Sequence, residues 1–339
     1  MGRSDAASRK RLSRHVLTWG GLLVSVLFSY LAVRNTHFGD VWNGLRTSNY
    51  WWLLPAFFAL AFGLYLKAVR WRYLFSRETR PPAGPLTKAL LVGYFFNAIL
   101  PARAGEAARV LVLNQRAGTS RAEAGTTVVV ERGYDVLSLL LLLFVAVPWL
   151  PRVTWLHAAV VLALVLVAAF AVAIALLARF GVRPVHFVLR PLLRLPFVSS
   201  ETLEHVGESL GRGLAGLRHP LLIAGALFWT TLAWLAIALS SWFVMKGFHF
   251  RLSLVAALLV VIATNLVQIL PSSPSALGVF EAATVVALGA YGVAGSDALS
   301  YALVLHAAST LPFIVVGLFL LRDTLSLRRA AERRAAGLS

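Results

Sequence analysis

The sequence predicts an all-α, polytopic membrane protein. We expect a helical bundle built as an inverted repeat, in which each half has three spans and one re-entrant hairpin. Hydrophobic residues make up 59% of the 339 residues, and charged residues only 14%. Several apolar runs reach the length that a helix needs to cross a bilayer. Two further apolar segments are interrupted by a proline, which is typical of helices that turn back inside a membrane.

The first half of the chain, residues 1–152, contains three predicted spans. The run 16–33 follows a basic start and is too long for a cleaved signal peptide. The segment 34–50 is predicted to be a loop. The run 51–69 leads into a basic loop that contains several prolines, and the run 122–148 is the third span. Because basic loops remain in the cytoplasm, the N-terminus and the loop after residue 69 are placed there.

Between the second and third spans, the apolar segment 86–100 is too short to cross a bilayer. It offers about fifteen residues before Pro101, whereas a span needs about 20. The flanking loops are both basic, so the simplest topology is a hairpin that enters and leaves on the cytoplasmic side. Its tip contains Asn97, Pro101 and Gly105.

The second half, residues 153–339, repeats this order of elements. The runs 155–178, 221–244 and 299–321 are predicted spans. The basic segment 179–219 carries apolar residues at three- and four-residue spacing, which indicates a cytoplasmic amphipathic helix. The C-terminal tail is basic and is therefore also placed in the cytoplasm.

A second hairpin is predicted where the runs 252–270 and 276–291 meet at a turn rich in proline and serine. Its tip residues Asn265, Pro271 and Gly278 follow the same order as the first tip, with different spacing. This hairpin enters from outside. Broken helices at corresponding positions of two oppositely oriented halves are typical of secondary transporters. In the alternative topology the two runs simply span, which gives eight crossings.

Charge and composition limit the possible partners. The net charge of +18 comes from 32 basic against 14 acidic residues, and anionic lipid headgroups explain this excess better than nucleic acid. The chain has no cysteine, which excludes disulfides and thiolate metal sites. It has no Walker loop, dinucleotide fingerprint or histidine pair at ligand spacing, so the sequence predicts no cofactor and no metal.

Charged residues in otherwise apolar segments are the candidate substrate-binding site, because charge inside a membrane is costly and marks a pathway. They are Arg103, Glu106, Arg109, Glu131, Arg132, Asp135 and Glu281. Arg103, Glu106 and Arg109 lie three apart and share a helix face, with Glu106 between two cations. Glu131 and Asp135 lie four apart and share a face of the third span.

Two interpretations of these charges stay open. In one, the arginines hold an anionic phosphate, and the carboxylates position them or accept protons. In the other, the ions pair only with one another and lock the hairpin to the span. Glu281 has no basic neighbour in sequence, so it is either an isolated acid that cycles a proton or a partner of Arg103. His306, in the last span, is interpreted as a core histidine bonded to a neighbour.

Three motifs occur together in the chain. They are Asn97-x-x-Leu100-Pro101-Ala102-Arg103-x-Gly105-Glu106-x-x-Arg109, Glu131-Arg132-x-x-Asp135 and Gly278-x-x-Glu281. Together they resemble the lysylphosphatidylglycerol synthase transmembrane family, also called flippase-like. The resemblance covers nearly the whole chain and implies functional roles for the charged residues of the motifs. One departure is His306, near which many members have an arginine.

In bifunctional members of that family, a membrane domain of this kind is fused to a cytosolic aminoacyl-transferase domain and moves the aminoacylated lipid to the outer leaflet. The chain stops at Ser339, so the resemblance implies a stand-alone, transporter-like member. We expect a multi-pass protein of the cytoplasmic membrane that translocates an anionic phospholipid or a polyprenyl-phosphate-linked lipid.

Two other classes of function are carried as alternatives. One is a lipid-modifying transferase that uses Glu131 and Asp135 with a divalent metal. The other is a non-transporting scaffold that binds lipid or a partner lipid-modifying enzyme.

Overall fold

The computed structural model describes residues 20–34, 36–75, 80–100, 103–180, 220–268 and 273–335. Every regular element in these ranges is a helix, which confirms the predicted all-α class. The tip residues Pro101 and Pro271 lie outside the described ranges, as do residues 181–219 of the predicted amphipathic segment.

The helices of the first half follow the predicted order, with one addition. They are the helix Gly20–Val33, α2 (Phe38–Thr47), η1 (Tyr50–Trp52), α3 (Leu53–Tyr73), α4 (Ala83–Ile99), α5 (Ala104–Ala117), α6 (Arg121–Ala146) and η2 (Val147–Trp149). Helices α3 and α6 correspond to the predicted spans 51–69 and 122–148. Helices α4 and α5 lie in the segment of the first predicted hairpin.

The addition is α2, in a segment that the sequence predicts as a loop. The helix packs against α13: the His37 backbone N–H donates to Ser296 Oγ at 3.0 Å, and Ser300 Oγ donates to the Val41 carbonyl at 3.0 Å. The Val41 side chain is buried and Trp42 is exposed. The loop prediction is wrong here because these contacts come from residues more than 250 positions away, which stabilise a helix too short to stand alone.

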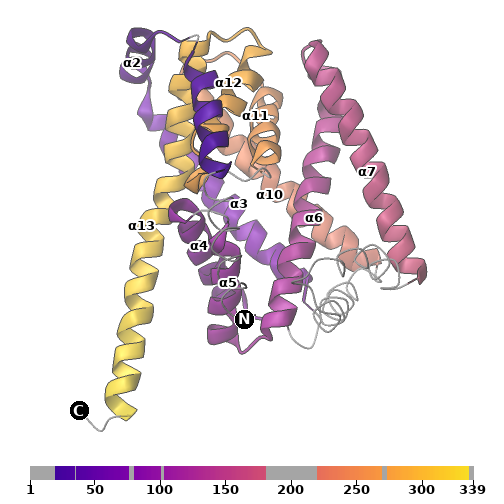
Figure 1. Ribbon diagram of the computed structural model, residues 1–339, viewed down its shortest axis with the longest axis vertical. Coiled ribbons are helices and arrows are strands. Elements are labelled where there is room, and N and C mark those ends of the chain that lie inside the picture. Colours follow the sequence, from indigo (N-terminus) through magenta and orange to yellow (C-terminus); the bar gives the residue numbers. More distant parts are fainter. Residues whose placement is uncertain are drawn as a thin grey trace, which may run out of the picture.

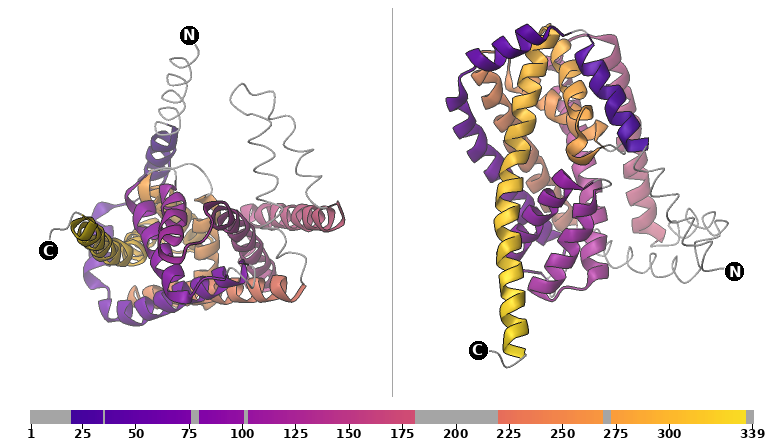
Figure 2. Two further views of the ribbon diagram at one scale, coloured as in Figure 1. Left: turned by 90° about the horizontal axis from the view of Figure 1, so that it is seen from below. Right: turned by 60° about the vertical axis from the view of Figure 1, so that its left-hand side comes forward.

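The helices of the second half are α7 (Thr154–Phe180), α10 (Pro220–Gly247), α11 (Leu254–Val267), η5 (Pro274–Ala276), α12 (Val279–Gly289) and α13 (Gly295–Ala335). Helices α7, α10 and α13 correspond to the three predicted spans. Figure 1 places α7 at one flank of the bundle, and Figure 2 shows α13 running along its whole length. Helices α11 and α12 pack against each other as the second pair of short helices.

The two short-helix pairs lie toward opposite ends of the molecule, α4–α5 below and α11–α12 above in Figure 1. Helices α4 and α5 have 17 and 14 residues, and α11 and α12 have 14 and 11. At about 1.5 Å per residue, each helix is shorter than the roughly 30 Å of a bilayer's hydrocarbon core.

Among the described helices, α3 and α10 make the most extensive contact, and small residues allow it. A Cβ atom added to Gly63 would lie 3.2 Å from the carbonyl oxygen of Ala233 and 3.5 Å from the Cβ of Ala236. The two backbones therefore approach closely. Small residues at a helix crossing are typical of membrane proteins, in which packing rather than water exclusion holds helices together.

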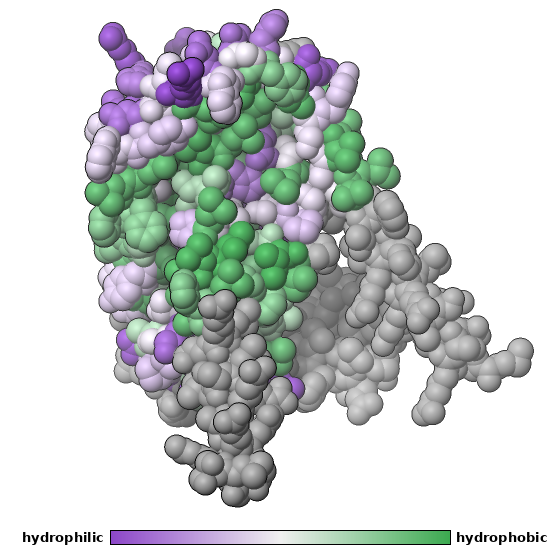
Figure 3. Space-filling model, turned by 90° about the vertical axis from the view of Figure 1, so that its left-hand side faces the viewer, coloured by the Kyte–Doolittle hydropathy of each residue, from purple (hydrophilic) through white to green (hydrophobic). Residues whose placement is uncertain are grey.

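The outer surface of the bundle carries many large apolar side chains, such as Phe58 and Phe62 on α3 and Val161 and Val165 on α7. Figure 3 shows a broad apolar belt on one face, with hydrophilic residues gathered at the upper end and a small hydrophilic group at mid-height. In the described chain, three helical stretches are both long and apolar enough to cross a membrane: Tyr50–Tyr73, Leu222–Gly247 and Gly295–Leu320.

Candidate functional site

A cavity of about 630 Å³ lies inside the bundle, where the turns of the two short-helix pairs meet. Its wall includes Asn97 and Arg103 from the α4–α5 pair, and Asn265, Gln268 and Ser275 from the α11–α12 pair. Helices α3, α6, α10 and α13 contribute further residues, both apolar and polar, to the wall. Residues of both predicted tips therefore lie around one cavity.

Arg103 connects the two tips directly. Its backbone is left-handed, with φ 53° and ψ 37°, an uncommon conformation for a residue other than glycine that here ends the turn and begins α5. Its Nη2 donates to the backbone carbonyl of Gln268 at 2.5 Å, and its Nη1 lies 3.7 Å from Glu106 Oε1. The Arg103 side chain is still 40% exposed, so part of the guanidinium remains open to the cavity.

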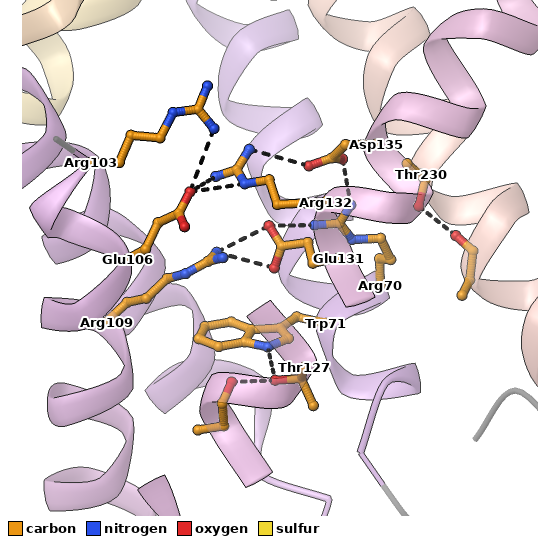
Figure 4. A network of polar contacts seen from close by, with 12 residues as sticks. Arg70, Trp71, Arg103, Glu106, Arg109, Thr127, Glu131, Arg132, Asp135 and Thr230 are labelled. Carbon is orange, nitrogen blue, oxygen red and sulfur yellow. Dashed lines mark hydrogen bonds and ion pairs between the residues drawn. The ribbon is translucent and has the colours of Figure 1, made fainter. Parts of the chain in front are cut away.

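Arg132 joins α6 to α5 at the edge of the same cavity (Figure 4). Its Nε donates to Glu106 Oε1 at 2.9 Å, and its Nη2 lies 2.7 Å from the same oxygen. On its other side, Nη1 lies 3.6 Å from Asp135 Oδ2. Arg132 is 39% exposed, and both Arg132 and Asp135 line the cavity, whereas Glu106 does not.

A second, inner layer of charged side chains is buried behind Arg103, Glu106 and Arg132. Arg109 Nη1 donates to both carboxylate oxygens of Glu131, at 3.0 and 3.1 Å, and its guanidinium carbon lies 5.0 Å from the centre of the Trp71 ring. Arg70 Nη2 lies 2.8 Å from Glu131 Oε1, and Arg70 Nη1 donates to Asp135 Oδ1 at 2.6 Å. Arg70, Arg109 and Glu131 do not line the cavity.

The seven predicted residues therefore occupy different places. Glu106 pairs with Arg103 and Arg132 rather than standing between Arg103 and Arg109, because Arg109 turns to Glu131 on α6. The inner layer joins α5 to α6 through buried ion pairs, which fits the locking interpretation. Arg103 and Arg132 keep exposed guanidinium groups at the cavity, which fits the phosphate interpretation.

Two basic residues of α3 are absent from the sequence-based site. A span ending at residue 69 leaves Arg70 in the following loop, but α3 continues to Tyr73 and Arg70 is fully buried. Lys67 lines the cavity, with its Nζ 3.8 Å from the Trp234 ring centre. The available signal is the spacing of Lys67 and Arg70, which are three apart near the end of an apolar helix and so share a face.

Glu281 is neither isolated nor paired with Arg103. His306 Nδ1 lies 2.6 Å from Glu281 Oε1, and the Gly278 backbone N–H donates to Glu281 Oε2 at 2.7 Å. The other ring nitrogen, Nε2, lies 2.9 Å from Ser275 Oγ. His306 is thus bonded to neighbours through both nitrogens, as predicted for a core histidine, and it also lines the cavity.

The two tip asparagines both line the cavity but make different hydrogen bonds. Asn97 Oδ1 accepts the Gly105 backbone N–H at 2.9 Å, one of the N–H groups left free at the start of α5. Asn265 Nδ2 instead donates back to the Val261 carbonyl in its own helix, at 2.9 Å. The likeness of the two tips in sequence therefore does not extend to these contacts.

The two tip glycines are both required by close contacts. A Cβ atom on Gly105 would lie 1.9 Å from the Gly93 carbonyl oxygen, so α4 and α5 cross at backbone contact. Gly278 has a φ of 81°, and a Cβ atom there would lie 2.1 Å from Ser29 Oγ. Gly278 thus allows the helix Gly20–Val33 to pack against the second tip.

An apolar outer belt, helices of spanning length and a charged interior cavity define a polytopic helical membrane protein. Residues 18–317 match the family model for the lysylphosphatidylglycerol synthase transmembrane region, and the chain belongs to this family.

Two relatives resemble different shares of the chain. A UPF0104 membrane protein of Methanothermobacter thermautotrophicus is 29% identical over 252 residues, which cover 71% of this chain and 74% of the relative. Glycosyltransferase AglD of Haloferax volcanii is 31% identical over 138 residues, which cover 39% of this chain. That match spans only 21% of AglD, about a fifth of its length.

Proposed function

We propose that the protein moves an anionic lipid, a phospholipid or a polyprenyl-phosphate-linked lipid, between the leaflets of the cytoplasmic membrane. The charge of the cavity carries this proposal. Among its lining residues, Lys67, Arg103 and Arg132 are basic and Asp135 is acidic, on walls that are otherwise largely apolar. This excess of positive charge favours a phosphate headgroup, since guanidinium groups bind phosphate by charge-assisted and often bidentate hydrogen bonds.

The buried charges have a supporting role in this proposal. Arg70 and Arg109 form ion pairs with Glu131, and Arg70 also pairs with Asp135. Asp135 in turn contacts Arg132, so the buried layer fixes the position of this cavity-facing arginine. A site with fixed donors loses little conformational entropy when it binds a headgroup. Helices α5 and α12 both begin next to cavity-lining residues, and the positive ends of their dipoles add to the attraction for an anion.

The arrangement of short helices suggests how the site is reached. We infer that residues 1–152 and 153–339 are inverted repeats, with α4–α5 entering from the cytoplasm and α11–α12 from outside. Their lengths and their placement at opposite ends favour re-entrant hairpins over eight full crossings. The headgroup would cross between the two tips while its hydrocarbon chains remain in the bilayer. Both termini are then cytoplasmic.

A lipid-modifying transferase is the second candidate, favoured by the partial similarity to AglD. Its metal-dependent form would need free carboxylates, but Glu131 and Asp135 are both engaged with Arg70. Within the described residues, no group of three histidine, cysteine, aspartate or glutamate side chains could hold a metal ion. Divalent-metal-dependent turnover of a lipid-linked sugar by the purified protein would favour this candidate over transport.

Reconstitution in liposomes with leaflet-specific quenching of a fluorescent anionic lipid tests the proposal. Arg103→Ala removes a cavity charge and leaves Glu106 paired with Arg132. We expect it to slow movement by about tenfold or more, since a hydrogen bond to a charged group contributes roughly 1.5–3 kcal/mol.

The matched control is Arg46→Ala, which removes an exposed charge at the end of α2 from a residue that does not line the cavity. It should move lipid as fast as the wild type. Equal rates for the wild type and Arg103→Ala would contradict the proposed site.

A further inference from the structure

Three residues of the second half form a chain of hydrogen bonds that the transport proposal does not use, and Ser275 Oγ also lies 3.4 Å from Thr310 Oγ1. Ser275 Oγ lies 2.9 Å from His306 Nε2, and His306 Nδ1 lies 2.6 Å from Glu281 Oε1. The residues come from three elements: η5, α13 and α12. Nothing in the sequence spacing of a serine, a histidine 31 positions later and a glutamate between them indicates this arrangement.

The hydrogen bonds assign each group a chemical role. Glu281 Oε2 accepts the Gly278 backbone N–H at 2.7 Å, which fixes the carboxylate. With the carboxylate ionised, Nδ1 of a neutral His306 carries the proton and donates it to Oε1. Nε2 is then the acceptor and faces the Ser275 hydroxyl. This is the order of groups in which an acid orients a histidine and the histidine activates a serine.

Ser275 is also presented to the cavity. Both Ser275 and His306 line it, and the Ser275 side chain belongs to a partly exposed residue, whereas Glu281 is buried and does not line the wall. Ser275 has a left-handed backbone, with φ 57° and ψ 8°, inside the short turn before α12. A non-glycine residue in this conformation is strained, and such strain concentrates at functional positions.

We propose that Ser275 is a nucleophile, with His306 as its general base and Glu281 as the positioning residue, and that it accepts the acyl group of a carboxylic ester of an anionic lipid in the cavity. The alternative is a purely structural polar network that stabilises the packing of α12 against α13. That alternative needs neither a serine facing the cavity nor the acceptor nitrogen of the histidine directed at it.

The chemical steps need only the ester and water or a second alcohol. Ser275 Oγ attacks the ester carbonyl carbon as its proton passes to His306 Nε2. The bond from that carbon to the alcohol oxygen breaks, and the alcohol leaves with the proton from Nε2. Water or a second alcohol then attacks the acyl carbon and gives its proton to Nε2. The bond from that carbon to Ser275 Oγ breaks, Oγ takes the proton from Nε2, and the acid or the new ester leaves with the Ser275 hydroxyl restored.

An alkyl fluorophosphonate probe tests this inference on the full chain in detergent, with the labelled peptide identified by mass spectrometry. We expect the wild type to be labelled at Ser275 and Ser275→Ala to lose that label. His306→Gln keeps a neutral polar side chain but removes the base, so labelling should be at least about 100-fold slower. Ser273→Ala is the matched control, because its hydroxyl contacts the carbonyl oxygens of Pro274 and Leu277.

Labelling of Ser275 no faster in the folded wild type than in the heat-denatured protein would overturn the inference, whether or not the variants fold. Equal labelling rates for the wild type and a folded His306→Gln would overturn it as well. The inference uses the cavity but does not depend on transport. If Arg103→Ala moves lipid normally while Ser275 is labelled, only the transport site is contradicted.

Discussion

Arginines of the same network have different roles according to their depth. Arg70 is fully buried and contacts both Glu131 and Asp135, whereas Arg103 is 40% exposed and contacts a carbonyl and one carboxylate. Removing one member of a buried pair leaves an uncompensated charge in a medium of low dielectric. Removing a partly exposed member leaves a charge that water can reach. Stability and substrate contact should therefore be separable by mutation.

Arg70→Ala should destabilise the fold strongly, by about 3–5 kcal/mol, because Glu131 and Asp135 lose a buried partner. Arg103→Ala should cost about 1 kcal/mol or less. Thermal unfolding of both variants in the same detergent compares them directly. A midpoint for Arg70→Ala within a degree of that for Arg103→Ala would mean that the buried layer does not hold α3 to α6.

At this scale, the sequence identifies residues better than it identifies their partners. Charges in apolar segments are visible in the chain, so Arg103 and Arg132 could be identified as members of the candidate site. The Glu281–His306 contact requires α12 to lie beside α13, and 25 residues separate the two side chains. Such contacts depend on how the helices pack against one another, and the local periodicity of the sequence does not encode that packing.

Among the elements, the first short-helix pair depends on a close crossing at Gly105. Helices α4 and α5 cross with Gly105 against the Gly93 carbonyl, and Asn97 Oδ1 accepts the Gly105 N–H at the same point. This crossing sets the position of Arg103, which lies two residues before Gly105. The geometry of the cavity is thus coupled to backbone contact between two helices.

Gly105→Ala should destabilise the protein by about 1–3 kcal/mol or more, because the added methyl group overlaps backbone rather than a flexible side chain. Gly84→Ala, in the same pair of helices, is the matched control: its Cβ would meet nothing within 4 Å, and alanine favours helix. Thermal unfolding and size-exclusion profiles provide the measurement. A Gly105→Ala protein as stable as Gly84→Ala would contradict the close crossing.

The long helices and both short pairs could be predicted from the sequence, since apolar run length and proline breaks are local signals. Helix α2 could not. Its ten residues form a helix by bonding to Ser296 and Ser300, far along the chain. The extension of α3 to Tyr73 could not be predicted from the sequence either, because charged residues at the end of an apolar run resemble the start of a loop.

For the whole molecule, the proposal combines two features that have separate causes. The apolar belt follows from composition and places the bundle in a membrane. The cavity follows from the meeting of two turns from opposite ends, where Arg103 bonds to Gln268. Together they place basic side chains inside a structure surrounded by lipid, which is where an anionic headgroup would need them.

Binding of lipid to the purified protein, measured by native mass spectrometry, tests this central claim most directly. With phosphatidylglycerol and phosphatidylethanolamine supplied in equal amounts, the wild type and the Arg46→Ala control should retain the anionic lipid preferentially. Arg103→Ala should lose that preference, because the cavity loses one of its three basic lining residues. An Arg103→Ala protein that retains phosphatidylglycerol as the wild type does would contradict the claim that the cavity binds the headgroup.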